Sequence, residues 1–232
     1  MRSHLTRPFR ELFQLLFPTH CCCCDRMLVG DEHDLCLTCL SHLPYTHDEV
    51  IPDNSTAQLF WGKFRFSNAM SLLVFQQGNA TQKIVHQIKY YNQKHLAIVM
   101  GHMMGEALLR TKGFQSVDML IPVPLHRRKE RRRGYNQSEL LCRGIAEVFA
   151  KDISKGNLIR TKNTESQTHK SPEERRENMK EVFHVKHPQA LEGKHLLLID
   201  DVATTGATIT SCCHELLKIP GVKISIATLA KA

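Results

Sequence analysis

The chain has 232 residues, of which 42% are hydrophobic and 23% are charged, as in ordinary globular proteins. This composition excludes disorder as the main state, and the length is enough for one or two domains with a sizeable core. A net charge of +8 favours anionic partners such as nucleic acid, acidic lipid or a phosphorylated small molecule.

The first 17 residues combine three arginines with a short apolar stretch that Glu11 and Gln14 interrupt, and they lack an Ala-x-Ala cleavage site. They predict a short amphipathic helix rather than a secretion signal, and a cytoplasmic location. Thiols stay reduced in that compartment, which favours metal binding over disulfides. No apolar run approaches the ~20 residues of a membrane-spanning helix, so we expect no membrane insertion.

Six of the nine cysteines lie between residues 21 and 39. Cys21 and Cys24 form one Cys-x2-Cys pair, Cys36 and Cys39 form another, and four thiolates at this spacing can bind Zn²⁺ at ~2.3 Å each. Because four-thiolate sites leave no open position for substrate, we expect a structural zinc in a small N-terminal zinc-ribbon module. The substitute ligands that remain open are Cys22, Cys23, His20, His33 and His42.

A polar, turn-rich stretch over 43–55 is interpreted as a linker, which divides the chain into an N-terminal part, 1–55, and a larger domain, 56–232. Apolar periodicity in the larger part predicts strands over 71–75, 117–123, 195–202 and 223–229, and helices over 81–90, 96–111, 136–149 and 207–218.

The pattern of these elements predicts an α/β fold. Asn136-x-x-Glu139 is typical of a capping box at a helix start. The strand, helix and strand over 195–229 form the unit of a parallel sheet, with a right-handed crossover expected. We therefore expect a parallel sheet flanked by helices.

Residues 196–208 (LLLIDDVATTGAT) are the most informative stretch. Asp200 and Asp201 end an apolar strand, where open parallel sheets place ligands, and a Thr/Gly loop then leads directly into a helix. Backbone N–H groups and threonine hydroxyls of this loop can bind a phosphate at the positive end of the helix dipole. The loop residues are Ala203, Thr204, Thr205, Gly206, Ala207 and Thr208.

The two carboxylates of Asp200 and Asp201 would repel a phosphate, so they must face another part of the ligand. Sugar hydroxyls and a bound Mg²⁺ are the two open choices. The pattern predicts a site for a sugar phosphate. The alternative is a strand, turn and helix in which the aspartates only cap the helix.

The run over 126–133 contains six basic residues in eight, among them Arg127, Arg128 and Lys129. One interpretation is a footprint for single-stranded nucleic acid, with Tyr135 as an aromatic for base stacking. The other is a solvated basic loop.

The stretch 196–208 resembles the phosphoribosyl pyrophosphate signature of type I phosphoribosyltransferases. With it, four further segments behind a four-cysteine N-terminus are similar to the ComF family of competence and GntX-like proteins. These segments are 121–126 (IPVPLH), 133–137 (RGYNQ), Thr164-x-x-Gln167 and 174–178 (ERREN). The resemblance covers nearly the whole chain, but residues 44–64 and 188–192 match nothing specific.

The resemblance implies a phosphoribosyltransferase-like fold and assigns roles to the site. Asp200 and Asp201 would be the catalytic residues that hold the ribose 2- and 3-hydroxyls, and residues 203–208 would hold the 5-phosphate. Mg²⁺ would bind with phosphoribosyl pyrophosphate. The residues expected to face the pyrophosphate are Val123, Pro124, Arg127 and Arg128. Residues 160–183 correspond to the loop that closes over substrate, the alternative being a surface helix from Ser171.

Three functions follow from this resemblance. The first is Mg²⁺-dependent transfer of a 5-phosphoribosyl group to an unknown nitrogen acceptor. The second is a non-catalytic module that handles single-stranded DNA beside a competence helicase. The third is a regulator that binds phosphoribosyl pyrophosphate without chemistry. The acceptor and the oligomeric state stay open.

Overall fold

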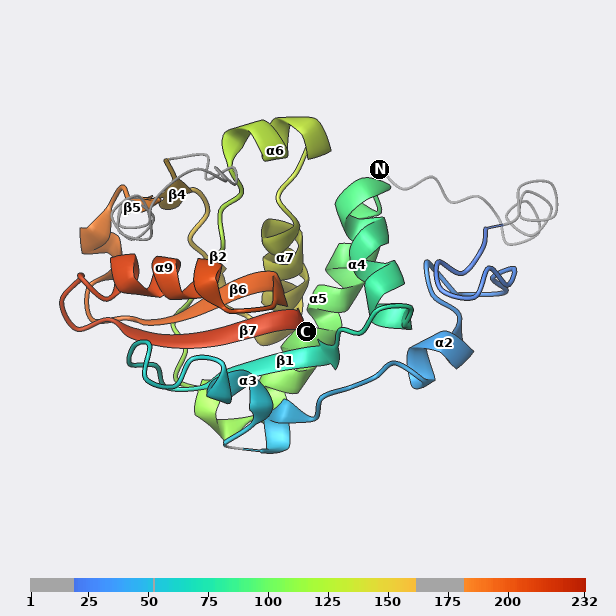
Figure 1. The fold of residues 1–232 in the computed structure, drawn as a ribbon, viewed down its shortest axis with the longest axis horizontal. Coiled ribbons are helices and arrows are strands. Elements are labelled where there is room, and N and C mark those ends of the chain that lie inside the picture. Colours follow the sequence, from blue (N-terminus) through green and yellow to red (C-terminus); the bar gives the residue numbers. More distant parts are fainter. Residues whose placement is uncertain (1–18, 52, 162–181) are drawn as a thin grey trace, which may run out of the picture.

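The computed structural model of the protein describes residues 19–51, 53–161 and 182–232 (Figure 1). The helix expected over 1–17 lies outside these residues. So do residues 162–181, which hold most of the expected closing loop, the surface helix from Ser171, and the Thr164-x-x-Gln167 and 174–178 motifs.

Five parallel strands form the central sheet, in the order β1-β7-β6-β2-β3. The strands are β1 (Ala69–Val74), β2 (Met119–Pro122), β3 (Asp152–Ile153), β6 (His195–Ala203) and β7 (Lys223–Lys231). The parallel α/β fold and its four expected strands are confirmed. The two residues of β3 are too few to show a period in the sequence.

The expected helices cover both faces of the sheet (Figure 1). Helices α4 (Ala80–Tyr90), α5 (Lys94–Arg110) and α7 (Gln137–Phe149) lie on one face. Helix α9 (Ala207–Leu216) lies on the other. The expected unit of strand, helix and strand at the C-terminal end of the sequence is therefore β6, α9 and β7.

The side chains of β6 supply both halves of the core. Leu197 and Ile199 pack on the side of α5 and α7, while Leu196 and Leu198 pack on the side of α9. This alternation follows from the two-residue period of a strand. It explains why a strand buried on both faces has a continuous apolar sequence before its two aspartates.

Helices α5 and α7 cross at glycines. A Cβ atom on Gly144 would lie 2.1 Å from the Ile98 carbonyl oxygen, and one on Gly101 would lie 2.4 Å from the Leu141 carbonyl oxygen. Any larger residue would push the helices apart, since the atoms that its Cβ would meet are backbone atoms of the facing helix. The crossing fixes α7 and, with it, the side chains at the N-terminal end of that helix.

The expected capping box at the start of α7 is only partly present. The Asn136 side chain accepts a hydrogen bond from the Ser138 N–H at 3.0 Å, as a capping residue should. Glu139 pairs instead with Lys155, whose ammonium lies 3.0 Å from its carboxylate.

Several short elements were not expected. The basic run 127–133, interpreted above as a loop, is the helix α6 (Arg127–Arg133). The His126 side chain accepts from the Arg128 N–H at 3.2 Å at its start, and Gly134, with a φ of 78°, ends it. The other short elements are α2 (Leu37–Ser41), α3 (Ser55–Gln58), the antiparallel pair β4 (Leu158–Arg160) and β5 (Phe183–Val185), and the 3-10 helices η1 (Asp48–Val50), η2 (Lys112–Phe114) and η3 (Pro188–Leu191).

The stretch interpreted as a linker packs against the sheet. The Val74 N–H donates to the Pro44 carbonyl at 2.7 Å, and the Thr46 N–H donates to that of Leu72 at 3.1 Å, so this stretch covers the outer edge of β1. Buried Asp48 accepts from the Ser71 N–H at 3.0 Å. The N-terminal cysteine segment shares a core with β1 and α4. The division of the chain at residue 55 stays a prediction.

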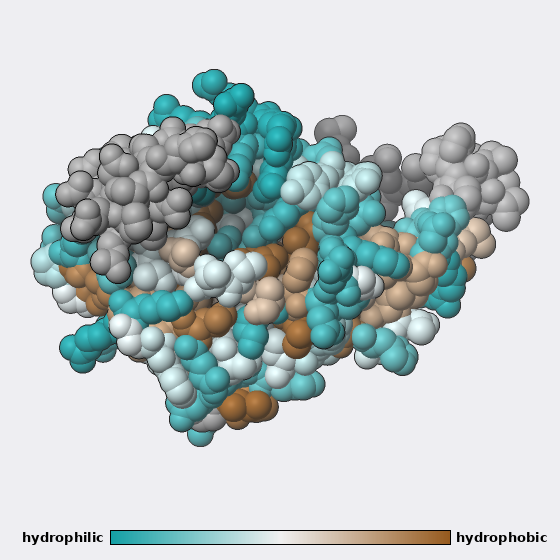
Figure 2. Space-filling model, viewed as in Figure 1, coloured by the Kyte–Doolittle hydropathy of each residue, from teal (hydrophilic) through white to brown (hydrophobic). Residues whose placement is uncertain are grey.

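Helices of the described ranges are all too short or too polar to span a bilayer. The face in Figure 2 is mixed, with the most hydrophilic surface over α6.

Candidate functional site

The candidate site lies where β2 ends beside the last residues of β6, which continues through Asp200 and Asp201 to Ala203. The Val123 N–H donates to the Ile199 carbonyl at 2.9 Å, so the residues that follow β2 lie directly beside the start of the aspartate pair. The Asn136 side chain donates to the Val123 carbonyl at 3.0 Å and ties the start of α7 to the same point. The carboxyl ends of the two strands thus bring together three segments that are far apart in the sequence.

Asp200 is held by two donors. Its Oδ1 atom accepts from the Ser138 hydroxyl at 3.1 Å and from the Asp201 N–H at 2.9 Å. Burial and the adjacent charge of Asp201 raise the pKa of Asp200 to about 7. Ser138 could not be predicted from the sequence, because its position directly after the 133–137 motif gives no sign of its partner.

Asp201 pairs with a lysine from another element. The Lys89 ammonium, in the last turn of α4, lies 3.1 Å from Asp201 Oδ2. The two side chains are only 22% and 15% exposed, so the pair is largely shielded from water. The sequence analysis did not identify Lys89, which precedes Asp201 by more than a hundred residues.

The loop that follows the aspartates is tightly constrained at Gly206. This residue has a φ of 72°, and a Cβ atom there would lie 2.7 Å from Phe60 Cε1. Both the backbone conformation and the close approach of the ring require glycine. The loop, Asp200 and Ile209 line a hollow of about 50 Å³ at the N-terminus of α9. The side chains of Thr204, Thr205 and Thr208 are exposed there.

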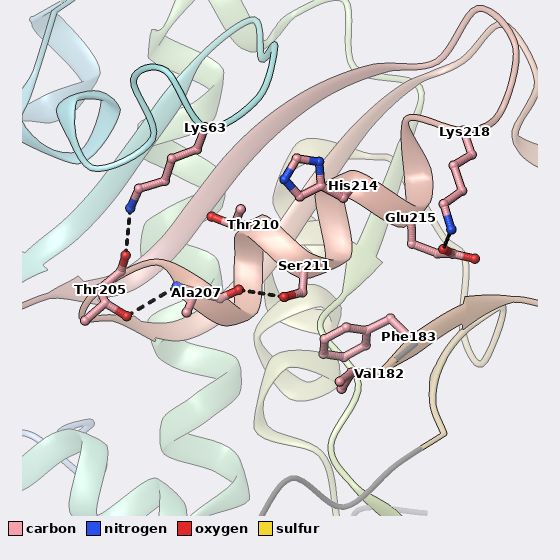
Figure 3. Close-up of a pocket in the computed structure, with 10 residues that line it drawn as sticks. All are labelled: Lys63, Val182, Phe183, Thr205, Ala207, Thr210, Ser211, His214, Glu215 and Lys218. Atoms are coloured by element: carbon pink, nitrogen blue, oxygen red, sulfur yellow. Dashed lines mark hydrogen bonds and ion pairs between the residues drawn. The ribbon is translucent and has the colours of Figure 1, made fainter. Parts of the chain in front are cut away.

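Two residues before β1 support this loop from outside. The Lys63 ammonium donates to the Thr205 carbonyl at 2.9 Å (Figure 3). Phe60 is fully buried under Gly206 and contacts the rings of Phe64 and Phe66, with centroids 5.7 and 6.2 Å away. These residues lie in or next to the stretch 44–64, in which the sequence analysis found no specific match.

A larger recess of about 660 Å³ runs along the outer face of α9 (Figure 3). It meets the loop at Thr205 and Ala207 and continues past Ser211 and His214. Its wall includes Phe183 of β5. This recess is mostly apolar. It lies beside the loop over 203–208 and is not lined by Asp200 or Asp201.

The residues expected at the pyrophosphate surround the site without lining the small hollow. Val123 is buried and Pro124 half-buried, and Arg127 and Arg128 are exposed at the start of α6. Tyr135, expected to be available for stacking on bases, is instead buried and donates from its hydroxyl to the Ile88 carbonyl. That expectation was wrong, because the hydroxyl is bound to α4 and the Lys94 ammonium of α5 lies 5.3 Å from the centre of the ring.

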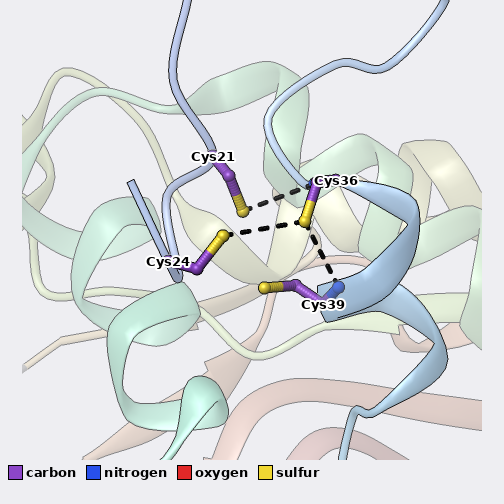
Figure 4. A group of neighbouring side chains, drawn as sticks. All are labelled: Cys21, Cys24, Cys36 and Cys39. Atoms are coloured by element: carbon purple, nitrogen blue, oxygen red, sulfur yellow. Dashed lines mark hydrogen bonds between the residues drawn. The ribbon is translucent and has the colours of Figure 1, made fainter. Parts of the chain in front are cut away.

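The four expected zinc ligands come together in the N-terminal segment (Figure 4). The Sγ atoms of Cys21, Cys24, Cys36 and Cys39 all lie within 4.8 Å of one another, and those of Cys24 and Cys36 are 3.7 Å apart. A tetrahedral zinc with bonds of ~2.3 Å places its sulfurs about 3.8 Å apart, so the cluster fits this metal.

Backbone N–H groups also point at these sulfurs. The Cys36 N–H donates to Cys21 Sγ at 3.4 Å and the Cys39 N–H to Cys36 Sγ at 3.3 Å. Burial acts to raise the pKa of Cys21, but hydrogen bonds from the backbone at Cys36, Cys24 and Cys23 outweigh it and lower the pKa to about 6. Cys21 therefore favours the thiolate, the form that binds metal, whereas burial and hydrogen bonds with the neighbouring thiols raise the pKa of Cys39.

The neighbouring thiols of Cys22 and Cys23 lie outside this cluster. Cys23 Sγ contacts the Ala80 carbonyl at 3.8 Å. Cys22 Sγ lies 4.0 Å from Cys23 Sγ. His42 bonds to the Thr38 carbonyl at 2.8 Å, and the His33 ring packs against His95. Within the described ranges, the four-cysteine group is the one set of side chains arranged to hold a metal.

Known proteins similar to this chain include bacterial proteins named for DNA utilization and for competence. The phosphoribosyl transferase domain family matches residues 142–232. The chain is 33% identical to DNA utilization protein YhgH of Salmonella typhimurium over 138 residues, 58% of this chain and 60% of that protein. It is 30% identical to competence protein F of Haemophilus influenzae over 155 residues, 64% of this chain and 67% of that protein.

A third relative, competence protein ComFC of Bacillus subtilis, is 40% identical over 101 residues, 43% of this chain and 38% of that protein. The chain thus spans less than two thirds of the length of the YhgH and ComFC proteins.

The raised pKa of Asp200 predicts a stability difference that depends on pH. Between its ordinary value of 3.8 and about 7, the folded chain binds more protons than the unfolded chain, so stability falls as pH rises through this window. Asp200→Asn cannot ionise. We expect its free energy of unfolding to exceed that of the wild type by on the order of 2 to 4 kcal/mol at pH 8, and the excess to shrink towards pH 4.

Urea unfolding of both proteins over this pH range measures the effect. The matched control is Asp53→Asn, an exposed aspartate whose replacement should change stability little at any pH. A constant difference between Asp200→Asn and wild type from pH 4 to pH 8 would show that Asp200 has an ordinary pKa.

Proposed function

Because this chain belongs to the ComF family of phosphoribosyltransferase-fold proteins, we propose that its β6–α9 site binds phosphoribosyl pyrophosphate and transfers the 5-phosphoribosyl group to a nitrogen acceptor. One observation carries the proposal: two differently held carboxylates stand immediately before a glycine-turned loop at a helix N-terminus. A site for a simple anion would not need the carboxylates, and a helix cap would need only one.

Each part of the site has a distinct role in this proposal. Asp200 and Asp201 accept hydrogen bonds from the ribose hydroxyls, and the N–H groups of residues 203–208 hold the 5-phosphate. In the transfer, the acceptor nitrogen bonds to the anomeric carbon as the bond to pyrophosphate breaks, and the acceptor loses a proton. Mg²⁺, held mainly by the substrate's phosphate oxygens, would neutralise the leaving pyrophosphate.

The segment after β2 is proposed to face the pyrophosphate. Val123 is hydrogen-bonded to Ile199, the residue before Asp200, and Arg127 and Arg128 begin the helix that follows Val123 and Pro124. Their exposed guanidinium groups can stabilise charge that develops on the leaving group.

Calorimetric titration with Mg²⁺ and phosphoribosyl pyrophosphate tests the proposal. The wild type should bind, and the double variant Asp200→Asn/Asp201→Asn should lose at least about 100-fold in affinity, since two charged acceptors are removed. Asp53→Asn should bind as the wild type does.

Pyrophosphate release over a panel of nitrogen acceptors separates transfer from binding. Release that depends on both aspartates supports the enzyme. Tight binding with no release across the panel would leave a regulator that uses the ligand as an effector, and absence of wild-type binding would reject the site altogether.

We also propose that the cysteine cluster holds a structural Zn²⁺. Four thiolates complete the tetrahedron and leave no position for substrate, so the metal would fold the N-terminal segment and seat it on β1 and α4. Thiolate ligands need a reducing compartment, which supports the cytoplasmic location expected from the sequence.

Neighbouring cysteines supply a matched test of the zinc site. We expect about one equivalent of zinc in the wild type and in Cys22→Ser, and none in Cys36→Ser, whose melting temperature should fall by several degrees. Metal content by atomic absorption and thermal unfolding measure both. Zinc lost from Cys22→Ser and kept by Cys36→Ser would contradict the assignment.

A second candidate function is the handling of single-stranded DNA beside a helicase, and one surface favours it. We define the α4–α6 surface as Tyr90, Tyr91, His86 and the arginines of α6. Tyr90 and Tyr91 are 58% and 60% exposed, and the Arg133 guanidinium lies 5.3 Å from the centre of the Tyr90 ring. Exposed rings beside a cationic helix are the elements that bind unpaired bases and their phosphates.

The names of the relatives support this candidate and link it to DNA uptake in natural competence. The two functions share Arg127 and Arg128 of α6, while the exposed tyrosines of the α4–α6 surface and the loop over 203–208 are separate residues.

Fluorescence anisotropy with a labelled oligothymidine tests the second candidate. Tyr90→Ala/Tyr91→Ala should weaken binding roughly 10-fold by removing stacking, whereas Arg131→Ala/Arg132→Ala should reduce the salt dependence. Trp61→Ala removes an exposed ring outside this surface and should change nothing. Affinity that resists added salt, or equal losses in Trp61→Ala and the tyrosine variant, would count against this surface.

A further inference from the structure

The Lys89–Asp201 ion pair has no role yet in the proposed binding of sugar phosphate. We propose that Lys89 is a positioning residue that orients Asp201 towards the sugar and thereby makes the site prefer ribose over 2-deoxyribose. This inference rests on the proposed function and specifies the part of the ligand that the site recognises.

The pattern of hydrogen bonds leaves one oxygen of each aspartate for the ligand. Asp200 uses Oδ1 for Ser138 and the Asp201 N–H, and Asp201 uses Oδ2 for Lys89. Among the contacts of the described ranges, Asp200 Oδ2 and Asp201 Oδ1 take part in none. Two such oxygens on adjacent residues match two neighbouring hydroxyls of a ribose, each of which donates one hydrogen bond.

Lys89 is well placed to fix the second of these oxygens. A carboxylate rotates about its terminal bond, and an ammonium 3.1 Å from Oδ2 restrains that rotation. The pair is mostly shielded from water, where its attraction is stronger than at a surface. Without Lys89, the repulsion between the two adjacent carboxylates would lose the cation that offsets it. The Asp201 side chain could then rotate away from the sugar.

The helix that carries Lys89 is itself anchored. Ile84, Val85 and Ile88 bury one face of α4 in the core, and the Tyr135 hydroxyl donates to the Ile88 carbonyl, next to Lys89. The ammonium group is therefore held from a rigid backbone rather than from a loop. A fixed donor of this kind can set the geometry of the carboxylate before the ligand arrives.

The test compares affinities for ribose 5-phosphate and 2-deoxyribose 5-phosphate, measured by calorimetry at one ionic strength. The wild type should prefer ribose 5-phosphate by about 10-fold or more, because the deoxy sugar leaves a carboxylate without its hydroxyl donor. In Lys89→Met this preference should fall to within about 3-fold, through weaker binding of the ribose sugar alone. Lys89→Arg should restore most of it.

Lys155→Met is the matched control, since it removes a lysine that lies at a similar distance, 3.0 Å against 3.1 Å, from a carboxylate that is not in the site. It should keep the wild-type preference. Circular dichroism and thermal unfolding confirm that each variant folds. If Lys89→Met does not fold, Lys89→Gln replaces it, and an intermediate preference is expected because the amide can donate to Asp201 without a charge.

The two ways of failing are distinct. A folded Lys89→Met with the wild-type preference overturns the role of Lys89 and leaves the site intact. A wild type that binds neither sugar phosphate overturns the proposed function and the role of Lys89 together. A variant that loses both sugars equally, while Lys89→Arg regains neither, shows a merely structural lysine.

Discussion

The parallel pairing of β2 with β6 is the constraint on which the site depends. Because the two strands run in the same direction and pair in register up to Pro122 and Ile199, the chain leaves β2 at Val123, directly beside the aspartate pair of β6, and leaves β6 after Ala203. The second exit forms the loop and α9, while the first leads through α6 to α7. Any ligand bound between these exits contacts segments that only the sheet brings together.

The short segment 135–138 connects these exits to the helices. Tyr135 bonds to the end of α4, Asn136 bonds to Val123 and caps α7, and Ser138 bonds to Asp200. These contacts link the end of β2 and the aspartate pair of β6 to helices α4 and α7. The close contact of α5 and α7 at their glycines fixes the position of α7, whose N-terminal end this segment forms. Tyr135 and Asn136 of the RGYNQ motif thus hold the start of α7, from which Ser138 contacts Asp200.

The sequence predicted the parts of this arrangement that are contiguous in the chain. The strand before Asp200, the Thr/Gly loop and the following helix have strong local patterns, so β6 and α9 were expected where they lie. Lys63, Phe60 and Lys89 could not be predicted, since each contributes through a tertiary contact from a distant element. The same reason explains the error at Tyr135, whose burial depends on how α4 packs.

The central claim is that residues 200–208 form a sugar-phosphate site, and an amide NMR titration of the labelled full chain with ribose 5-phosphate tests it most directly. We expect saturable shifts of the N–H signals of residues 203–208 and of Asp200 and Asp201, with the cysteine cluster unaffected. Shifts confined to other regions, or none at concentrations that saturate a specific site, would contradict the account.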